Sequence, residues 1–368
     1  MRHEVAVRHL AGTAFAILLA LPLGAGSARA MNEDNVPMVL EKAVDGFIRP
    51  GYHAFEEASG VMASAMGAFC ATPDEATYGE ATAAFDELVG AWSHIEIVRT
   101  GPVIDDHRFE RILFYPDRKS IGLKQVQAAI IEEDESAADP DYLPEKSVAM
   151  QGLLALEFVL FGTQYETMFE APETYRCRYG AAIAENIDTI AGELSEEWDA
   201  KDGVAAHWKN PGPDNPLFRT NDEALTALLG VLVHGMETVR DQRLEYFYRG
   251  EEGPNIPTRA IYWRSENTWP SIRDNLAGLQ ALLNNSDMVD LLDEDVRSIV
   301  SSINFLFSSV EGVVGGMNPD IEVVLSDPDQ LAKLDYLLIN TRDLILRLND
   351  RYGGAIGLGA GFSFSDGD

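Results

Sequence analysis

The sequence is poor in cysteine, histidine and basic residues, and these shortages limit the functions that it can serve. Of 368 residues only 2 are cysteine and 7 are histidine, and 28 Lys and Arg stand against 60 Asp and Glu. The net charge of −32 repels nucleic acid and anionic lipid surfaces, since both are negatively charged. We therefore expect no nucleic-acid partner, whereas the same field attracts cations and basic partners.

Common catalytic motifs are missing as well. The sequence contains no H-E-x-x-H pair, no G-x-S-x-G elbow, no phosphate-binding loop and no dinucleotide fingerprint. The two cysteines cannot form a zinc site without histidines, and neither has a second cysteine at the short spacing of structural zinc sites. The sequence therefore favours a binding protein over an enzyme.

The longest uncharged stretch lies at the start of the chain and is typical of a signal peptide. Arg2 and Arg8 precede an apolar stretch from Leu10 to Leu23, and a small-residue cleavage site ends at Ala30. The stretch is shorter than the roughly 18 to 20 residues that a membrane span needs. We predict that residues 1–30 are removed, that the chain from Met31 is periplasmic, and that it does not insert into the membrane.

The exported part is more acidic than the precursor. Subtracting three arginines and one glutamate in residues 1–30 from 28 and 60 leaves 25 basic and 59 acidic residues, a net charge of −34. Both cysteines, Cys70 and Cys177, lie in this part. An oxidising compartment predicts a disulfide between them, with two separate buried thiols as the alternative.

Helical periodicity dominates residues 31–368 and predicts an all-α fold. Apolar residues recur at steps of three and four from Ala184 to Trp198 and from Leu334 to Leu348. Only Ile112 to Tyr115 resembles a strand, and a buried loop explains it equally well. The other predicted helices are Pro50–Cys70, Pro73–His94, Ser120–Ile131, Ser147–Phe161, Asn221–Phe247, Thr268–Leu283 and Glu294–Val314.

One stretch is suited to connect two halves. Residues 201–219 are rich in glycine and proline and lack a periodic apolar stripe. We predict an N-terminal helical bundle over residues 31–200 and a C-terminal helical bundle over residues 220–368, packed against each other.

Several strings, taken in order, resemble the imelysin family. They span nearly all of the exported chain: Trp92, Arg99–Pro102, His107–Asp117, Gly152–Gly162, Arg176–Tyr179, Trp263–Ser265 and Gly357–Phe362. The resemblance implies two packed helical bundles with a cleft between them. It also implies a bacterial envelope protein associated with iron, in a family once assigned a peptidase activity.

The family signature G-x-H-x-x-E is incomplete in this chain. The matching positions hold Gly152, Leu154 and Glu157, so the histidine is replaced. Glu157 lies in an apolar stretch, where burying an unpaired carboxylate is costly. It is either a paired structural residue, with Arg108 or Arg111 as the expected partner, or part of a ligand site that binds iron or another divalent cation.

Two other places reproduce the His-x-x-Glu spacing. They are His53 with Glu56 and His234 with Glu237. Residues three apart share a helical face, so an imidazole and a carboxylate can approach one ion. An ordinary contact on the helix surface is the alternative for each pair, and a metal site requires the four side chains to converge.

The resemblance implies an imelysin-like protein linked to iron acquisition, and the signal peptide predicts that it is periplasmic. Its cleft is expected to bind a cation or a small iron-bearing ligand without turnover. A metal-dependent peptidase is the first alternative, and a module that docks another envelope protein is the second.

Overall fold

The chain folds into two layers of helices. A computed structural model describes residues 31–250 and 253–361, so the predicted signal peptide, residues 1–30, lies outside the described residues. The regular elements of this part of the chain are all helices and it contains no strand, which confirms the predicted all-α class. None of its helices is long and apolar enough to cross a membrane.

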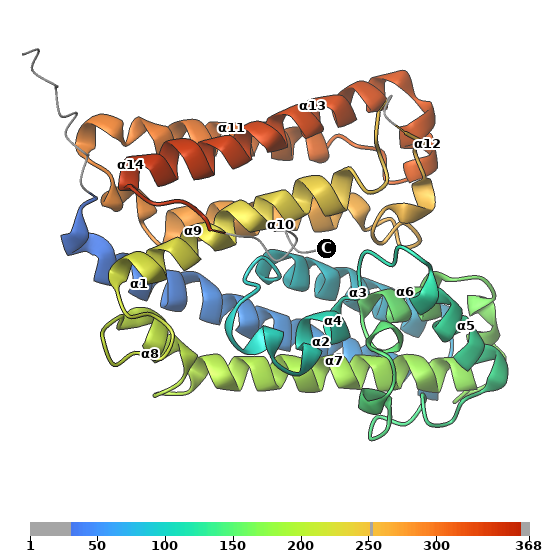
Figure 1. Ribbon diagram of the computed structural model, residues 1–368. Helices are drawn as coiled ribbons and strands as arrows, with labels where there is room; N and C mark the ends of the chain where they lie inside the picture. The colour runs from blue at the N-terminus through green and yellow to red at the C-terminus, as the bar shows by residue number, and fades with distance from the viewer. Residues whose placement is uncertain (1–30, 251–252, 362–368) are drawn as a thin grey trace, which may run out of the picture.

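The helices of residues 31–209 form the lower part of Figure 1, and those of residues 221–356 form the upper part. The lower helices are α1 Val36–Ala43, α2 Arg49–Ala71, α3 Glu75–Ile95, α4 Arg108–Ile112, α5 Ile121–Glu132, α6 Leu153–Phe161, α7 Tyr175–Asp199 and α8 Val204–Lys209. The upper helices are α9 Asn221–Glu237, α10 Thr268–Asn285, α11 Ser298–Val314, α12 Ile321–Ser326, α13 Pro328–Leu346 and α14 Gly354–Ile356. The predicted connecting loop thus contains a short helix, α8.

The long helices α2 and α7 lie side by side and run in opposite directions. Cys70, at the end of α2, forms a disulfide with Cys177, at the start of α7, and their Cα atoms are 5.5 Å apart. At the other end, His53 of α2 contacts Asp199 of α7. The predicted disulfide is confirmed, and it holds together the two longest helices of the lower layer.

The two layers meet closely where α10 packs on α3. A Cβ atom at Gly278 would overlap the carbonyl oxygen of His94, so only glycine allows this approach. Beside it, Asn275 Nδ2 donates hydrogen bonds to the Ser93 carbonyl at 2.6 Å and to Glu96 Oε1 at 2.7 Å. The buried apolar residues of both layers form one continuous core.

The predicted apolar stripes are confirmed, but several predicted helix starts are wrong. The helix predicted from Pro50 is confirmed as α2, which begins one residue earlier at Arg49 and continues from α1 through a π-helical segment, Val44–Ile48. Proline has no backbone N–H, and the wider π-helical turn before it accommodates the missing hydrogen bond. The helix predicted from Ser147 begins only at Leu153, after a 3₁₀ turn at Val148–Met150.

Side-chain caps mark the starts of two helices. Helix α3 begins after Asp74, whose side chain accepts hydrogen bonds from the N–H groups of Ala76 and Thr77, rather than at Pro73. Helix α9 begins at Asn221, as predicted, and is capped by Thr220, whose side chain accepts from the N–H of Glu223. The segment after Ile112 is an irregular, partly buried stretch, as the loop alternative predicted.

Candidate functional site

Glu157, the carboxylate of the family motif, is deeply buried, and its hydrogen bonds are made by the other half of the chain. It lies in α6 and is 1 % exposed. Its Oε1 accepts hydrogen bonds from the backbone N–H groups of Arg264 and Ser265 at 3.0 and 3.1 Å and from the Ser265 hydroxyl at 3.1 Å. The Arg264 guanidinium lies 3.7 Å from Oε2. The carboxylate is thus held by four groups of one short segment.

The predicted partners of Glu157 are wrong. Arg108 forms ion pairs with Glu193 at 3.1 Å and Glu197 at 2.8 Å, both on α7. Arg111 donates to the side-chain oxygens of Gln151 at 2.9 Å and Asn186 at 3.0 Å. Both arginines therefore bind acidic or amide side chains other than Glu157. Arg264 takes the place predicted for them.

The other two motif positions, Gly152 and Leu154, lie in different surroundings. A Cβ atom at Gly152 would overlap the carbonyl oxygens of Arg111 and Ile112, so glycine lets the start of α6 pack against the end of α4. Leu154 and Glu157 are three residues apart and line the same cavity. The motif position without its histidine therefore presents an apolar side chain to this cavity.

This cavity, which we call the Glu157 cavity, has a volume of about 270 Å³ and is lined by both halves of the chain. Three arginines line it: Arg118, Arg259 and Arg264. The other carboxylate in its wall, Asp117, caps the start of α5 by accepting from the N–H groups of Ile121, Gly122 and Leu123. Asp117 and Glu157 therefore both accept hydrogen bonds from backbone N–H groups. The three arginines of the cavity wall outnumber these two carboxylates.

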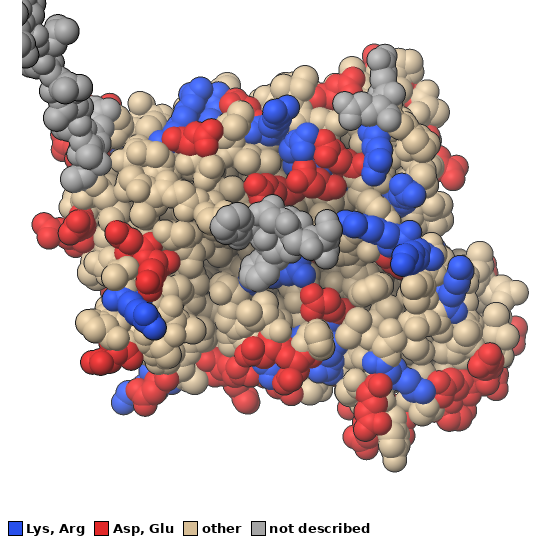
Figure 2. All heavy atoms as spheres, in the orientation of Figure 1, with Lys and Arg blue, Asp and Glu red and all other residues tan. Residues whose placement is uncertain are grey.

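A wider groove with a volume of about 970 Å³ adjoins the Glu157 cavity and shares Arg118, Arg259 and Tyr246 with it. Arg240 and Arg249 line the groove as well, together with acidic residues such as Asp241 and Asp335. Figure 2 shows basic side chains gathered where the upper layer meets the α5–α6 end of the lower layer, whereas acidic side chains dominate the lower edge. Four arginines thus line this groove of a strongly acidic chain, and one of them, Arg240, pairs with Asp241 and Glu245.

The pKa of Glu157 lies above its ordinary value of 4.5 because burial disfavours the charged form, although Arg264 and the hydrogen bonds to Ser265 oppose this shift. Between the unfolded and the folded pKa, the folded protein holds a proton that the unfolded chain has released. Wild type should therefore lose stability relative to Glu157→Gln as the pH rises through this window. Urea unfolding of both proteins from pH 4 to pH 8 measures the difference, with the exposed Glu57→Gln as the matched control. A difference that stays constant, or that grows in favour of wild type, would contradict a raised pKa.

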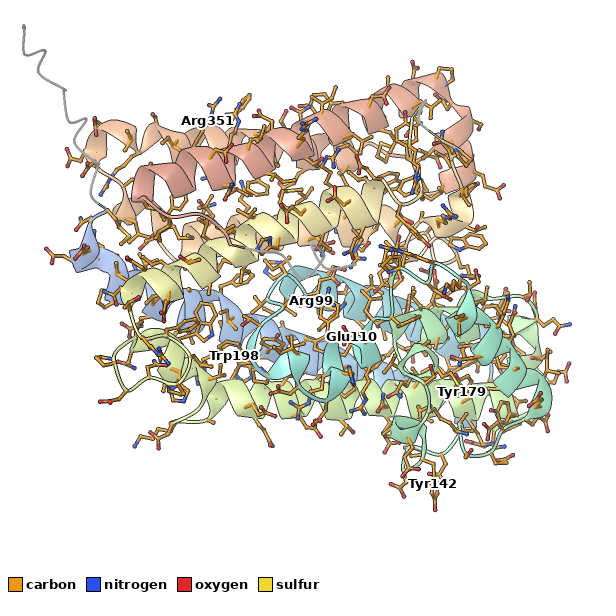
Figure 3. The ribbon with its side chains drawn as sticks, viewed as in Figure 1. Arg99, Glu110, Tyr142, Tyr179, Trp198 and Arg351 are labelled. Atoms are coloured by element: carbon orange, nitrogen blue, oxygen red, sulfur yellow. A yellow bond between two sulfur atoms is a disulfide. The ribbon has the colours of Figure 1, made fainter. Side chains whose placement is uncertain are left out.

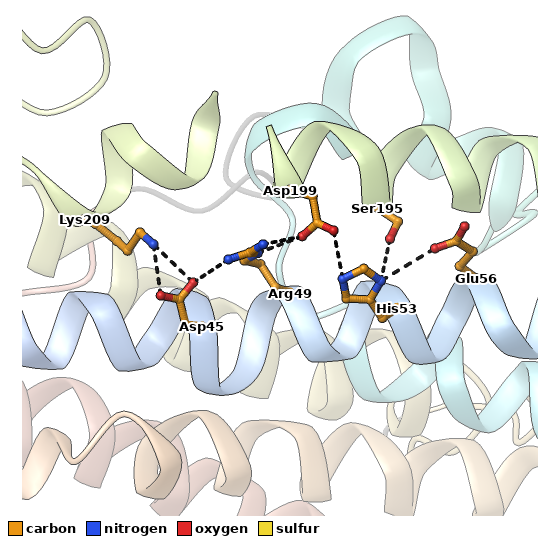
Figure 4. A network of polar contacts seen from close by, with 7 residues as sticks. All are labelled: Asp45, Arg49, His53, Glu56, Ser195, Asp199 and Lys209. Atoms are coloured by element: carbon orange, nitrogen blue, oxygen red, sulfur yellow. Dashed lines mark hydrogen bonds and ion pairs between the residues drawn. The ribbon is translucent and has the colours of Figure 1, made fainter. Parts of the chain in front are cut away.

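The first His-x-x-Glu pair belongs to a surface network that joins α2 to α7 (Figure 4). His53 Nδ1 lies 2.9 Å from the Ser195 hydroxyl and 3.7 Å from Glu56, and its Nε2 lies 3.1 Å from Asp199. Asp199 also pairs with Arg49, which pairs with Asp45. The network ties the ends of two antiparallel helices together.

Ser195, His53 and Asp199 have the order of contacts of an acyl-transfer triad, but not its surroundings. Ser195 is 3 % exposed and lies inside α7, where backbone N–H groups are used by the helix and cannot bind an oxyanion. A nucleophile must reach its substrate, and this hydroxyl does not. We therefore assign the three residues a structural role.

The second pair, His234 with Glu237, makes a contact within α9. Its two side chains are 2.9 Å apart, and His234 Nε2 lies 3.2 Å from the carbonyl oxygen of Ala360. The two pairs do not converge: nowhere in residues 31–250 and 253–361 do three or more His, Cys, Asp or Glu side chains gather so that they could hold a metal ion. The side chains within these two ranges therefore do not fit a protein-ligated metal centre.

Two features of the site were missed by sequence reasoning. Arg264 and Ser265 lie in a string that resembles the family, but no local pattern linked them to Glu157, which is more than 100 positions away. The buried ion pair of Glu96 with Arg243, at 2.9 Å, was missed as well. A charged residue at an apolar position of a predicted helix could have marked Arg243.

The fold and the cavity define an all-helical protein of two layers whose principal site is built by both halves. The family model described as imelysin, peptidase M75, matches residues 48–348. The chain therefore belongs to the imelysin family. No curated protein is significantly similar to it.

Solved structures support the fold. An imelysin-like protein from Psychrobacter arcticum 273-4 has a TM-score of 0.75 at 16 % identity, covering 90 % of this chain and 99 % of its own. A protein from Parabacteroides distasonis ATCC 8503, described as an iron-regulated protein A precursor, has a TM-score of 0.73 at 14 % identity, with 89 % and 97 % covered. At these identities the likeness establishes the fold alone.

Proposed function

We propose that this protein is a periplasmic binding protein of iron acquisition, and that the Glu157 cavity binds an intact, anionic iron-bearing ligand without turnover. The family, the description of one structural neighbour as iron-regulated, and the predicted signal peptide support the link to iron and to the periplasm. The observation that carries the choice of ligand is the pattern of charges in the cavity wall.

The cavity favours a chelated form of iron over the bare ion. A bare cation needs several anionic or neutral donors, and Asp117 and Glu157 are both engaged by N–H groups. Arginines, in contrast, bind carboxylate groups with charge-assisted and often bidentate hydrogen bonds. An iron ion wrapped in carboxylates presents those groups on its outside, so the chelate fits the arginines that line the cavity.

The metal-dependent peptidase is less well supported. Such an enzyme needs about three protein ligands and an activated water. The described residues offer no such group, and Leu154 stands where the family has histidine. Docking of another envelope protein stays a prediction.

Isothermal titration tests the choice between chelate and ion. We expect wild type to bind ferric citrate, used as an anionic ferric chelate, and to bind neither Fe²⁺ under anaerobic conditions nor Zn²⁺. Arg259→Gln should weaken chelate binding by about ten- to a hundredfold, since one charge-assisted hydrogen bond is worth about 1.5 to 3 kcal/mol. The matched control is Arg351→Gln, because Arg351 is exposed on the upper layer and lies away from the meeting of the layers (Figure 3).

Two results would contradict the proposal. One is tight binding of Fe²⁺ or Zn²⁺ that Glu157→Gln abolishes, which would place a metal ligand in the family motif. The other is chelate binding that Arg259→Gln and Arg351→Gln leave equally unchanged, because the arginines of the cavity would then have no part in recognition.

A further inference from the structure

The two carboxylate oxygens of Glu157 have different surroundings. Oε1 accepts three hydrogen bonds, from the N–H groups of Arg264 and Ser265 and from the Ser265 hydroxyl, at 3.0 to 3.1 Å. Oε2 accepts none from the described residues, and the Arg264 guanidinium lies 3.7 Å away, beyond hydrogen-bond distance. Oε2 is not fully enclosed by protein atoms, so it faces the Glu157 cavity. A proton that binds to Glu157 therefore binds to Oε2, on the side of the cavity.

An anionic ligand in this cavity would meet a negative charge at Oε2. Glu157 is 1 % exposed, and burial raises its pKa, although Arg264 and the hydrogen bonds to Ser265 oppose this shift. A ligand carboxylate that pairs with Arg264 comes close to Oε2, and one of two carboxylates that share a site holds a proton. Protonation removes the repulsion and turns Oε2 into a donor. A hydrogen bond from such a hydroxyl to a carboxylate is short and strong.

The other titratable groups around Glu157 are poorly suited to take up this proton. Asp117 accepts hydrogen bonds from backbone N–H groups with both of its oxygens. Arg176 of α7 faces the end of α6, where it donates to the carbonyl oxygens of Phe158 and Val159. Arginines already carry a proton, and burial raises the pKa of the tyrosines, so they keep theirs. These groups of the cavity wall are Arg118, Arg259, Arg264, Tyr115, Tyr246 and Tyr262.

We propose that Glu157 binds the anionic ligand as a carboxylic acid, taking up one proton from solvent and donating a hydrogen bond from Oε2 to a carboxylate of the ligand. This inference rests on the proposed function of the Glu157 cavity. Glu157 is then a residue that determines specificity: it favours an oxyanion that can accept this hydrogen bond, and Arg264 pairs with the ligand instead of with Glu157.

Proton uptake makes the affinity depend on pH. Binding of the anion raises the pKa of Glu157 further, so the complex holds a proton that the free protein has released. Between the two pKa values the affinity falls by up to about tenfold for each unit by which the pH rises, because one proton must be taken up. Below the pKa of the free protein, Glu157 is already protonated and this dependence disappears.

Isothermal titration with ferric citrate at pH 6, 7 and 8, in buffers of different ionisation enthalpy, counts the protons taken up. We expect wild type to take up as much as about one proton more than Glu157→Gln, whose amide is neutral at every pH. The comparison at each pH cancels the protonation of the ligand itself. The exposed Glu57→Gln is the matched control and should behave as wild type.

Infrared difference spectra of wild type test the same point without a variant of Glu157. Binding of ferric citrate should produce the band of a protonated carboxyl group, and this band should shift when the glutamates of the protein carry carbon-13. The inference is overturned if ferric citrate binds but wild type and Glu157→Gln take up equal numbers of protons, or if no carbon-13-sensitive band appears. In that case the proposed function stands. Failure of wild type to bind ferric citrate at any of these pH values would contradict the proposed function, and this inference with it.

Discussion

Replacing Arg243 with methionine is expected to lower the free energy of unfolding by about 3 to 5 kcal/mol. The change leaves Glu96 charged and buried, at 6 % exposure, with Asn275 as its remaining side-chain donor. Glu96 caps α3 in the lower layer and Arg243 follows α9 in the upper layer, so the loss also weakens the contact between layers. Urea unfolding followed by circular dichroism measures the effect.

The double variant Glu96→Met with Arg243→Met separates the ion pair from the packing. Removing both charges relieves the uncompensated carboxylate, and buried ion pairs are often replaced by apolar residues with little loss. The double variant should therefore recover a large part of the stability that Arg243→Met loses. A loss for Arg243→Met no greater than that for the exposed Arg351→Met would show that the pair does not hold the layers together.

Removing the disulfide is expected to be equally costly. Cys70 and Cys177 are 107 positions apart, and a cross-link that closes a loop of this length stabilises by about 4 to 5 kcal/mol through the entropy of the unfolded chain. Both cysteines are buried, so Cys70→Ala with Cys177→Ala also loses a small amount of packing. The double variant should unfold at a much lower urea concentration than oxidised wild type.

Reductant provides the matched control for the disulfide. Wild type unfolded in the presence of reductant should approach the stability of the double variant, and the double variant should not respond to reductant. Two free thiols in native wild type, or equal stability with and without the bond, would contradict this part of the account.

Much of the fold could be predicted because its signals are local. The stripes from Ala184 to Trp198 and from Leu334 to Leu348 mark faces that are buried in the structure, as helical periodicity requires. The disulfide was predicted from the oxidising compartment and from the presence of only two cysteines. Helix starts were less predictable: proline is compatible with a first helical turn, but the side chains of Asp74 and Thr220 decide where α3 and α9 begin.

The partners within the site could not be predicted from local patterns. The motif drew attention to Glu157, which is indeed buried and lines the main cavity. Its hydrogen bonds come from Arg264 and Ser265, and only the packing of the two halves brings them together. The strings that resemble the family suggested Arg108 and Arg111 instead, but these arginines contact Glu193 and Gln151.

The two His-x-x-Glu pairs show how little such a spacing implies by itself. Each pair makes the contact that a helical face allows, at 3.7 Å for His53 with Glu56 and at 2.9 Å for His234 with Glu237. Further ligands would have to come from other elements. Asp199 approaches His53, but among the described residues neither pair is part of a group of three or more side chains that could hold a metal ion.

Anomalous diffraction at the iron edge, from crystals soaked with ferric citrate, tests the central claim most directly. We expect one iron peak in the Glu157 cavity, separated from every protein oxygen and nitrogen by the carboxylates of the chelate, which contact Arg118, Arg259 or Arg264. An iron atom coordinated directly by Glu157, or a peak only outside this cavity, would contradict it.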